Sequence, residues 1–342
     1  MNVTLKQMRK QLVKMLKKLV SIQSESYNTK AMARYINQVV QSIPGCTTSF
    51  DKYGNIYVTK GQAETYPCMV CHIDTVHQIQ RDEVVPIQID QQLIAVFRNS
   101  LQQTGTGGDD KCGIVITLQN LMHLDKFKAV FFLDEEVGCV GSSNANYKFF
   151  DDVRYVLECD RKGHQDFVNK ISGCTLFDKK FEDAIAPYLS KYGRKITTGG
   201  LTDVYEIALE TDLCVANMSC GYYNPHTDNE YIDLDDVYDT FLLTHDLFRY
   251  VTDVYKVDTK RTKYYNYGYN YAKFGYDPYD PYDVEYENDE EEVTDTTNCG
   301  LGCAMSNGYC DSCHMSAEEL KSYFYHEDDS IRNQETGPRL LE

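Results

Sequence analysis

The chain has 342 residues, 42% of them hydrophobic, so it is long and apolar enough to bury a large core. Its formal net charge of −18 argues against nucleic-acid binding, because phosphate contacts need clustered lysine and arginine. The sequence contains no apolar run of about 18 residues and no apolar signal-peptide core, which argues against membrane insertion and export. We therefore expect a soluble cytoplasmic protein without nucleic-acid or membrane partners.

The distribution of the cysteines is also typical of a cytoplasmic protein. Thirteen are present, and the nine from Cys46 to Cys220 stand singly in apolar stretches of a chain too large to need disulfide staples. We expect these nine to be reduced thiols.

The first 24 residues carry basic but no acidic side chains, with apolar residues at helical spacing from Leu5 to Leu19. Such a basic amphipathic helix also suits a transit peptide or a membrane-surface helix. We favour an ordinary packing helix with a solvated basic face, because the pattern runs directly into Val20-Ser21-Ile22.

The next elements mix helix and strand patterns. Residues 29–43 have a helical apolar face, and residues 56–59 and 68–71 read as strands rich in β-branched or buried types. Residues 83–89 and 92–97 predict a hairpin joined at Asp90-Gln91.

Further along the chain, predicted helices and strands alternate. We expect helices at 113–124, 141–150, 175–192, 202–209 and 234–255, and strands at 129–133, 153–157 and 213–218. Alternation of this kind predicts an α/β fold, a mixed and mostly parallel sheet with helices on both faces. In open α/β sheets, the functional site lies at the carboxyl ends of the strands.

Polar stretches fall at those ends. The first to note is Thr106–Gly113, in which glycines flank the adjacent carboxylates of Asp109 and Asp110 before an apolar helix. Four more stretches carry histidine or acidic residues after predicted strands or in a polar loop: 71–76, 133–138, 158–160 and 224–230. Together they supply the nitrogen and oxygen ligands that paired Zn²⁺ ions use.

These motifs resemble those of the co-catalytic zinc exopeptidases of the peptidase T, aminoacylase and acetylornithine deacetylase type. The matches cover H-x-D, D-D-K-x-G, D-E-E, a later D and P-H, and they are His72-Ile73-Asp74, Asp109–Gly113, Asp134-Glu135-Glu136, Asp160 and Pro225-His226. The resemblance spans roughly residues 5–255 and implies a single zinc-exopeptidase-like (phosphorylase/hydrolase-like) domain.

The resemblance also implies roles for these residues. Asp109 would bridge two Zn²⁺ ions, one also held by His72 and Asp160 and the other by Glu136 and His226; Co²⁺ or Mn²⁺ could replace zinc. Asp74 would orient the ring of His72. Glu135 would be the catalytic general base in the hydrolysis of an amide bond. In this family, the peptide bond after the bridging aspartate is often cis.

One departure from the family pattern limits the classes of substrate that we expect. Typical members insert a lid and dimerisation domain between the fourth and fifth motifs, whereas only 66 residues separate Asp160 from His226 here. The compact layout favours an aminopeptidase or dipeptidase acting on small peptides. The alternatives are a deacylase of N-acyl amino acids and an idle scaffold that binds a partner. Asp203 and Glu230 are candidates for contacts with substrate or ligands, or for a helix cap and loop solvation.

The sequence predicts three regions. Residues 1–255 form the peptidase domain, and the acidic, tyrosine-rich residues 256–296 form a disordered linker that could bind a protein partner. Residues 297–342 form a tail whose Cys299, Cys303, Cys310 and Cys313, with His314 nearby, suit one structural Zn²⁺. Residues 310–314 also match a haem-attachment pattern, and a flexible tail with free thiols is the third interpretation.

Overall fold

The computed structural model describes residues 4–257, 305–306 and 309–310. The chain divides into two compact units, Met1–Thr262 and Lys263–Glu342. In the second unit, β15 (Met305–Ser306) and β16 (Tyr309–Cys310) form an antiparallel pair. Of the expected linker, Lys256 and Val257 belong to the first unit, where Lys256 pairs with Leu213 and Val257 is buried. The rest of the linker lies outside the described residues, as do three of the four proposed tail ligands, Cys299, Cys303 and Cys313, and His314.

The first unit contains the helices and two sheets. Its helices are α1 (Leu5–Val20), α2 (Lys30–Gln41), α3 (Gly108–His123), α4 (Val140–Ser143), α5 (Lys179–Lys191), α6 (Asp203–Glu210) and α7 (Leu234–Tyr250), with a 3₁₀ turn at Tyr147–Phe150. The strands of the large sheet are β1 (Cys46–Phe50), β2 (Ile56–Lys60), β3 (Tyr66–His72), β7 (Phe127–Phe132), β8 (Val153–Arg161), β9 (Asp166–Ile171), β10 (Cys174–Thr175), β11 (Lys195–Gly199) and β12 (Val215–Ser219).

The large sheet is mixed, with a parallel centre. Its strand order is β1-β2-β7-β3-β8-β12-β9-β10, and β11 pairs with β9. The central strands β7, β3, β8 and β12 run parallel, whereas β2 and β9 join this centre antiparallel on either side. The four parallel strands are joined by crossovers, which direct their carboxyl ends to one edge.

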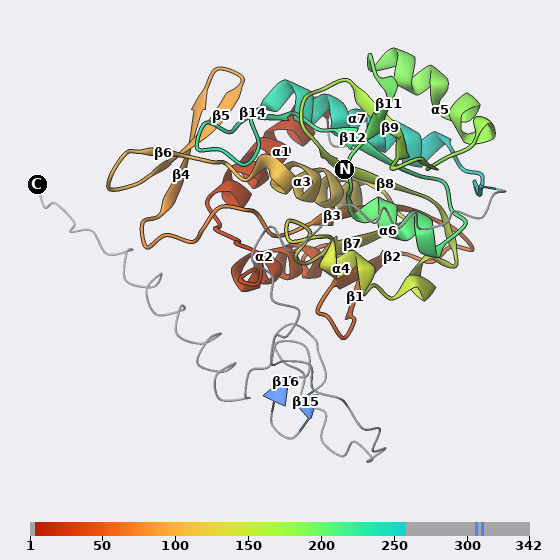
Figure 1. Cartoon of the computed structure of the whole chain (residues 1–342), viewed down its shortest axis with the longest axis horizontal. Coiled ribbons are helices and arrows are strands. Elements are labelled where there is room, and N and C mark those ends of the chain that lie inside the picture. The colour runs from red at the N-terminus through yellow and green to blue at the C-terminus, as the bar shows by residue number, and fades with distance from the viewer. Residues whose placement is uncertain (1–3, 258–304, 307–308, 311–342) are drawn as a thin grey trace, which may run out of the picture. The chain divides into compact units, whose positions relative to one another are not determined.

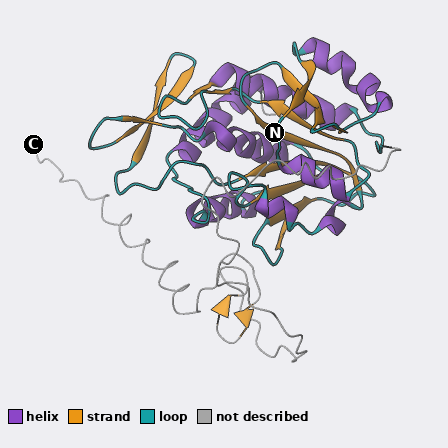
Figure 2. Ribbon diagram, viewed as in Figure 1, coloured by secondary structure: helices purple, strands orange, loops and turns teal. Residues whose placement is uncertain are grey.

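Helices cover both faces of this sheet (Figure 1; Figure 2). Strand β8 shows the division, because its alternate side chains point in opposite directions. The Tyr155 hydroxyl donates to the carbonyl of Leu247 in α7, whereas the Glu158 carboxylate accepts from the N–H of Val204 in α6. Helix α3 contacts β3, β7 and β8, and α1 and α7 pack on α3. The expected α/β fold is confirmed.

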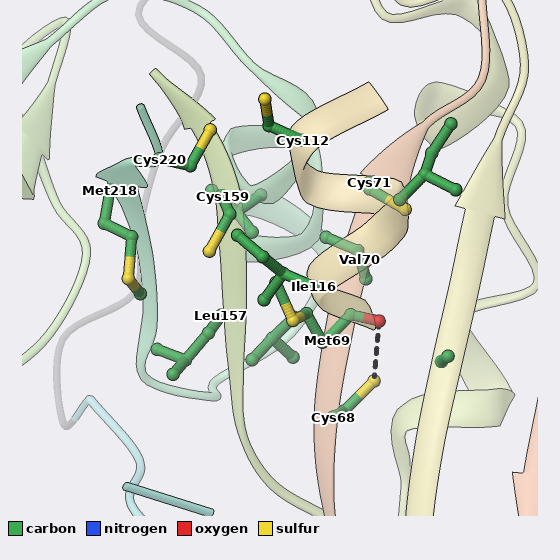
Figure 3. Packing of buried hydrophobic residues seen from close by; sticks show 14 of the residues in the cluster. Cys68, Met69, Val70, Cys71, Cys112, Ile116, Leu157, Cys159, Met218 and Cys220 are labelled. Carbon is green, nitrogen blue, oxygen red and sulfur yellow. Dashed lines mark hydrogen bonds between the residues drawn. The ribbon is translucent and has the colours of Figure 1, made fainter. Parts of the chain in front are cut away.

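The core lies between α3 and the parallel strands. Figure 3 shows Cys112 and Ile116 of α3 near Leu157 and Cys159 of β8, with Met218 of β12 beyond. All five side chains are fully buried. The nine cysteines from Cys46 to Cys220 are free thiols, as expected, and all except the half-buried Cys46 are buried.

A smaller, five-stranded sheet adjoins the large one. It has the order β13 (Tyr222–Tyr223), β14 (Tyr231–Asp233), β5 (Gln92–Phe97), β4 (Val84–Ile89), and β6 (Gln103–Thr104) pairs with β5. The predicted hairpin is confirmed, because β4 and β5 pair antiparallel with Ile89 opposite Gln92. Its two-residue turn includes Asp90 at φ 50°, a left-handed conformation that aspartate tolerates.

The N-terminal helix is an integral part of the domain. Leu12, Leu16 and Leu19 of α1 are fully buried, and the helix packs on α3. Thr4 caps it through a capping box with Gln7. The packing helix expected from the sequence is therefore present. In the part of the chain that is described, no helix is both long and apolar enough to cross a membrane.

Several predicted boundaries were wrong. The segment 141–150 is a short α-helix followed by a 3₁₀ turn, and the helix expected at 175–192 begins at Lys179, because Cys174–Thr175 pairs with β9. The last helix ends at Tyr250 rather than at residue 255. Strands β1, β9 and β11 were not predicted. The segment between Asp160 and His226 extends the large sheet and forms no lid domain, as its length suggested.

Candidate metal centre

The carboxyl edge of the parallel strands gathers the predicted ligands. His72 is the last residue of β3, Asp160 lies near the end of β8, and Glu136 lies in the loop after β7. Asp109 is at the start of α3, and His226 is in the loop between β13 and β14. Segments separated by more than a hundred residues in sequence therefore meet at one edge.

Asp109 lies between the two histidines. Its Oδ1 is 3.1 Å from His72 Nε2, and its Oδ2 is 3.2 Å from His226 Nε2. Asp109 and Asp110 have non-helical φ and ψ angles, the peptide bond between them is cis, and the regular turns of α3 follow. One carboxylate thus offers an oxygen to each side, which is the arrangement that a bridging ligand requires.

Asp160 is the third ligand candidate on the side of Asp109 that faces His72. His72 Nε2 is 3.6 Å from Asp160 Oδ1, and His72 is fully buried. Asp160 is held by neighbours: the Tyr222 hydroxyl donates to Oδ1 at 3.2 Å and the Thr202 hydroxyl to Oδ2 at 2.9 Å. The site also brings in Asp110, whose Oδ1 accepts from the N–H of Gly113 at 2.8 Å.

On the second side, Glu136 faces His226. His226 Nε2 is 3.1 Å from Glu136 Oε2, and the histidine side chain is 50% exposed. His226 has a φ of 63°, which turns its loop back towards the site. Glu136 Oε1 is buried and has no hydrogen-bond partner among the described residues. A buried carboxylate oxygen without a donor is costly unless a cation lies beside it.

Asp74 links the buried histidine to the loop that carries the two glutamates. Its carbonyl oxygen is 3.0 Å from His72 Nδ1, and its carboxylate is 3.4 Å from the same nitrogen. The carboxylate also accepts from the N–H of Glu135 at 3.0 Å and of Glu136 at 3.3 Å, and from the Ser26 hydroxyl at 2.7 Å. With Nδ1 as the donor, Nε2 of His72 is free to ligate.

Glu135 lies beside the group without bridging it. Its Oε2 is 4.0 Å from His72 Nε2, and its Oε1 accepts from the Cys139 thiol at 3.4 Å. Burial raises the pKa of Glu135 well above its usual range, and the charge of Asp160 adds to this effect. A raised pKa makes the carboxylate a stronger base than an exposed glutamate, which suits a residue that takes up a proton and passes it on.

Glu230 and Asp203 are both buried, so neither is a solvated loop residue. Glu230 accepts from the backbone N–H groups of Gly107 at 2.6 Å and of Asp109 at 3.2 Å, and it contacts His77 at 3.2 Å. Asp203 is the first residue of α6, whose N-cap is Thr202. Glu230 therefore braces the loop that presents Asp109.

The pKa values of the clustered acidic and histidine side chains depend strongly on one another. Burial would raise the pKa of Asp109, yet its hydrogen bonds with His226 and His72 hold it well below its usual range. Burial and the charge of Asp109 raise the pKa of Asp160 to about 7. Hydrogen bonds to Asp109 and Glu136 raise the pKa of His226 to about 10. A proton on His226 therefore offsets part of the clustered negative charge.

The donor set fits a metal ion: ligand atoms of His72, Asp109 and Glu136, and of His72, Asp110 and Asp160, lie within 4.8 Å of one another. The fit rests on the buried, unpartnered oxygen of Glu136 and on the two-sided position of Asp109. Imidazole and carboxylate ligands in threes suit zinc sites that keep a position open for water or substrate.

No family model and no curated protein matches the chain. Solved structures do share its fold. Aminopeptidase PepT from Bacillus cereus is 14% identical with a TM-score of 0.60, covering 71% of this chain and 98% of its own. An aminopeptidase from the archaeon Desulfurococcus kamchatkensis is 17% identical with a TM-score of 0.55, covering 74% and 99%. A tripeptidase from Staphylococcus aureus is 13% identical with a TM-score of 0.53, covering 70% and 99%.

At such low identities these similarities establish the fold. The chain has the fold of these two aminopeptidases and this tripeptidase, which is the fold that the motif resemblance implied. At the carboxyl edge of its parallel strands, this fold places a cluster of histidines and carboxylates that could hold a metal ion.

Sequence reasoning missed several residues that support this site. Thr202, Tyr222 and Cys139 each donate to one of the acidic side chains, yet no motif singles them out. Glu158 is different, because a signal existed. It lies two residues before Asp160 in the same strand, so strand alternation predicts both on one face. Its Oε2 lies 2.6 Å from the Thr202 hydroxyl oxygen, within hydrogen-bond distance.

Proposed function

We propose that this protein hydrolyses peptide bonds, as an aminopeptidase or dipeptidase acting on small peptides. The observation that carries the proposal is the position of Asp109 between His72 and His226, with Glu135 beside the group and not bridging it. The shared fold with aminopeptidases and a tripeptidase supports it.

The cofactor that we propose is a pair of Zn²⁺ ions, for which Co²⁺ or Mn²⁺ could substitute. When bound, the ions supply an activated water and polarise the substrate carbonyl. His72, Asp109 and Asp160 would hold one ion, and His226, Asp109 and Glu136 the other.

The residues around the ions have separate tasks. Glu135 takes a proton from the attacking water on a carboxylate oxygen and passes it to the leaving amine nitrogen. Its raised pKa, caused by burial, suits this transfer. Asp74 fixes Glu135 through the backbone N–H and fixes the ring of His72 through Nδ1. Glu230 holds the backbone of Asp109.

Location and partners belong to the same proposal. The nine free cysteines of the described domain suit a reducing compartment, and we propose the cytoplasm. Residues 256–296 remain a proposed contact region for a protein partner, and the tail cysteines a proposed structural zinc site. We propose no membrane or nucleic-acid partner, consistent with the net charge of −18.

The test compares substrates that differ at the amino end. The zinc-loaded full chain is assayed with aminoacyl amides, dipeptides and N-acetyl amino acids, alongside Glu135→Gln. Hydrolysis that requires a free amine and is lost in Glu135→Gln supports the proposal. Hydrolysis of N-acetyl amino acids alone would make the protein a deacylase, and no zinc-dependent hydrolysis of any of them would leave it a scaffold.

A further inference from the structure

A pocket of about 230 Å³ opens directly beside the metal-binding group. Its lining includes Asp160, Tyr222 and Pro225, the neighbour of His226. The segment Gly199–Leu201 and the side chain of Val168 complete it. A peptide whose scissile bond lies at the metal site would therefore place an adjoining residue in this pocket.

The pocket is basic, although the chain as a whole is strongly acidic. Arg161 and Lys162 line it, immediately after Asp160 in sequence. Asp160 is the one carboxylate in the lining, and the proposed metal would offset its charge. Asp166 pairs with Arg161, so the uncompensated positive charge of the pocket is that of Lys162. A positive charge in a pocket of an otherwise acidic protein favours an anionic ligand group there.

The two basic residues are held differently. Arg161 Nε donates to Asp166 Oδ2 at 2.6 Å and Nη2 approaches the carbonyl of Thr198 at 3.4 Å, so the guanidinium group is fixed in place. Lys162 is exposed and forms no ion pair with any of the residues that the structure describes. Arg161 is therefore pre-oriented, whereas Lys162 retains a charge available for a ligand.

The backbone beside Arg161 leaves room for this ligand. A Cβ at Gly199 would lie 2.9 Å from Val168 Cγ1 and 3.4 Å from Arg161 Nη1, and a Cβ at Gly200 would meet no atom within 4 Å. Glycine at these positions keeps the approach to the guanidinium group open.

We propose that this pocket binds a carboxylate of the substrate close to the scissile bond, recognised by Lys162 and Arg161. This inference rests on the proposed peptidase function and specifies its substrate class: short peptides with a negative charge one residue from the cleaved bond. The carboxylate has two sources, the free carboxyl terminus of a dipeptide or an acidic side chain. Both offer the planar anion that guanidinium and ammonium groups bind.

The substrate series separates these sources. The zinc-loaded full chain is assayed with Leu-Ala, Leu-Ala-amide, Leu-Glu-amide and Glu-Ala-amide. We expect kcat/KM for at least one carboxylate-bearing peptide to exceed that of Leu-Ala-amide by about 10-fold. Preference for Leu-Ala identifies the carboxyl terminus, for Leu-Glu-amide a leaving-residue side chain, and for Glu-Ala-amide an amino-terminal side chain.

Variants of Lys162 test the residue directly. Lys162→Gln should remove most of the preference, measured as the ratio of kcat/KM for the carboxylate form to kcat/KM for Leu-Ala-amide. Lys162→Glu should reverse the preference in favour of a basic residue at the same position. Lys170→Gln is the matched control, because Lys170 is exposed on β9 and does not line the pocket. Equal kcat/KM for carboxylate and amide forms, or an equal effect of Lys162→Gln on all substrates, would overturn the proposal.

A binding measurement separates failure of the pocket from failure of the function. Calorimetry compares Leu-Ala, Leu-Glu-amide and Glu-Ala-amide with Leu-Ala-amide on zinc-loaded Glu135→Gln, with and without Lys162→Gln. Tighter binding of a carboxylate form that depends on Lys162 supports the pocket, even where no substrate is hydrolysed. Absence of hydrolysis by the unmodified protein contradicts the peptidase proposal, whereas hydrolysis without carboxylate preference contradicts only the pocket.

Discussion

The carboxylate of Glu230 holds the backbone of Asp109, with the N–H of Asp109 3.2 Å from Oε1. The second oxygen accepts from the N–H of Gly107 at 2.6 Å. These bonds fix the segment that places one oxygen of Asp109 towards each histidine. The position of the central ligand therefore depends on a residue 121 positions later in the chain.

We first predict that Glu230→Gln weakens metal binding. A glutamine side chain has one acceptor oxygen where glutamate has two, so either Gly107 or Asp109 would lose its acceptor. We expect a 10- to 100-fold loss of zinc affinity, roughly the effect of removing partners that orient metal ligands. Chelator competition measures it, with Glu210→Gln, an exposed residue of α6, as the control. Unchanged affinity would show that Glu230 does not position the ligand.

The second prediction contrasts the two histidines. His72 is fully buried among Asp109, Asp160 and Asp74, whereas the side chain of His226 is 50% exposed. Replacing His72 with alanine should lower the free energy of unfolding by about 3–5 kcal/mol, because it leaves buried charges unpaired. Replacing His226 should cost less than about 1 kcal/mol in the metal-free protein, since solvent screens its ion pairs. Chemical denaturation in the presence of a chelator measures both, and equal losses would contradict the assigned burial.

A third prediction concerns Thr202. Its hydroxyl oxygen is 2.6 Å from Glu158 Oε2 and 2.9 Å from Asp160 Oδ2, yet it has one hydrogen to donate. Burial and the nearby carboxylates raise the pKa of Glu158 well above its usual range, so a protonated Glu158 can donate to Thr202, which then donates to Asp160.

Thr202→Val breaks this chain of hydrogen bonds. We expect a loss of about 1–3 kcal/mol in unfolding free energy, since two buried carboxyl groups lose a partner. Thr202→Ser, which keeps the hydroxyl, should recover most of it. Denaturant titrations measure the free energy of unfolding of each variant. A valine variant as stable as the unmodified protein would contradict the proposed hydrogen-bond network.

The fourth prediction is that metal-free protein loses stability as pH rises. Burial raises the pKa of Asp160 and of Asp203 to about 7, so these groups bind protons more tightly in the folded state. Their contribution is complete below an unfolded pKa of about 4 and is lost as pH rises through about 7. His226 has the same sign: its contribution is present below about 6.5 and lost as pH rises towards about 10.

Bound metal would replace these protons. The melting temperature in a chelator should therefore fall between about pH 5 and pH 9, and the zinc-loaded protein should show a smaller fall. Scanning calorimetry with and without zinc measures the difference. Metal-free stability that rises with pH over this interval would contradict the described protonation states.

Some strands could be predicted from the sequence because their apolar patterns indicate burial. Strand β3 is buried at every position, and its continuous apolar run is typical of a central parallel strand. Strand β1 is only half-buried at alternate positions, and β11 carries threonine and lysine on an exposed edge. Their pairing is decided by tertiary contacts with β2 and β9, which no local pattern reveals.

The residues of the site were likewise predictable only in part. The sequence indicated His72 and Asp109 through motifs that resemble a known family, and the structure brings them together. The supporting hydrogen bonds were not predictable, since Thr202 and Tyr222 reach Asp160 only after three segments fold together. The start of α3 was also missed, because Asp109 and Asp110 are not helical in their φ and ψ angles.

The most direct test of the central claim is to measure zinc content and peptidase activity on the same samples of the full chain and of Glu135→Gln. We expect both to bind the same amount of zinc, with at least two ions per chain. We also expect aminoacyl amide hydrolysis to fall by about 10²- to 10⁴-fold in the variant, the usual contribution of a general base. Unchanged activity in Glu135→Gln, or an unmodified protein that binds no zinc, would contradict this claim.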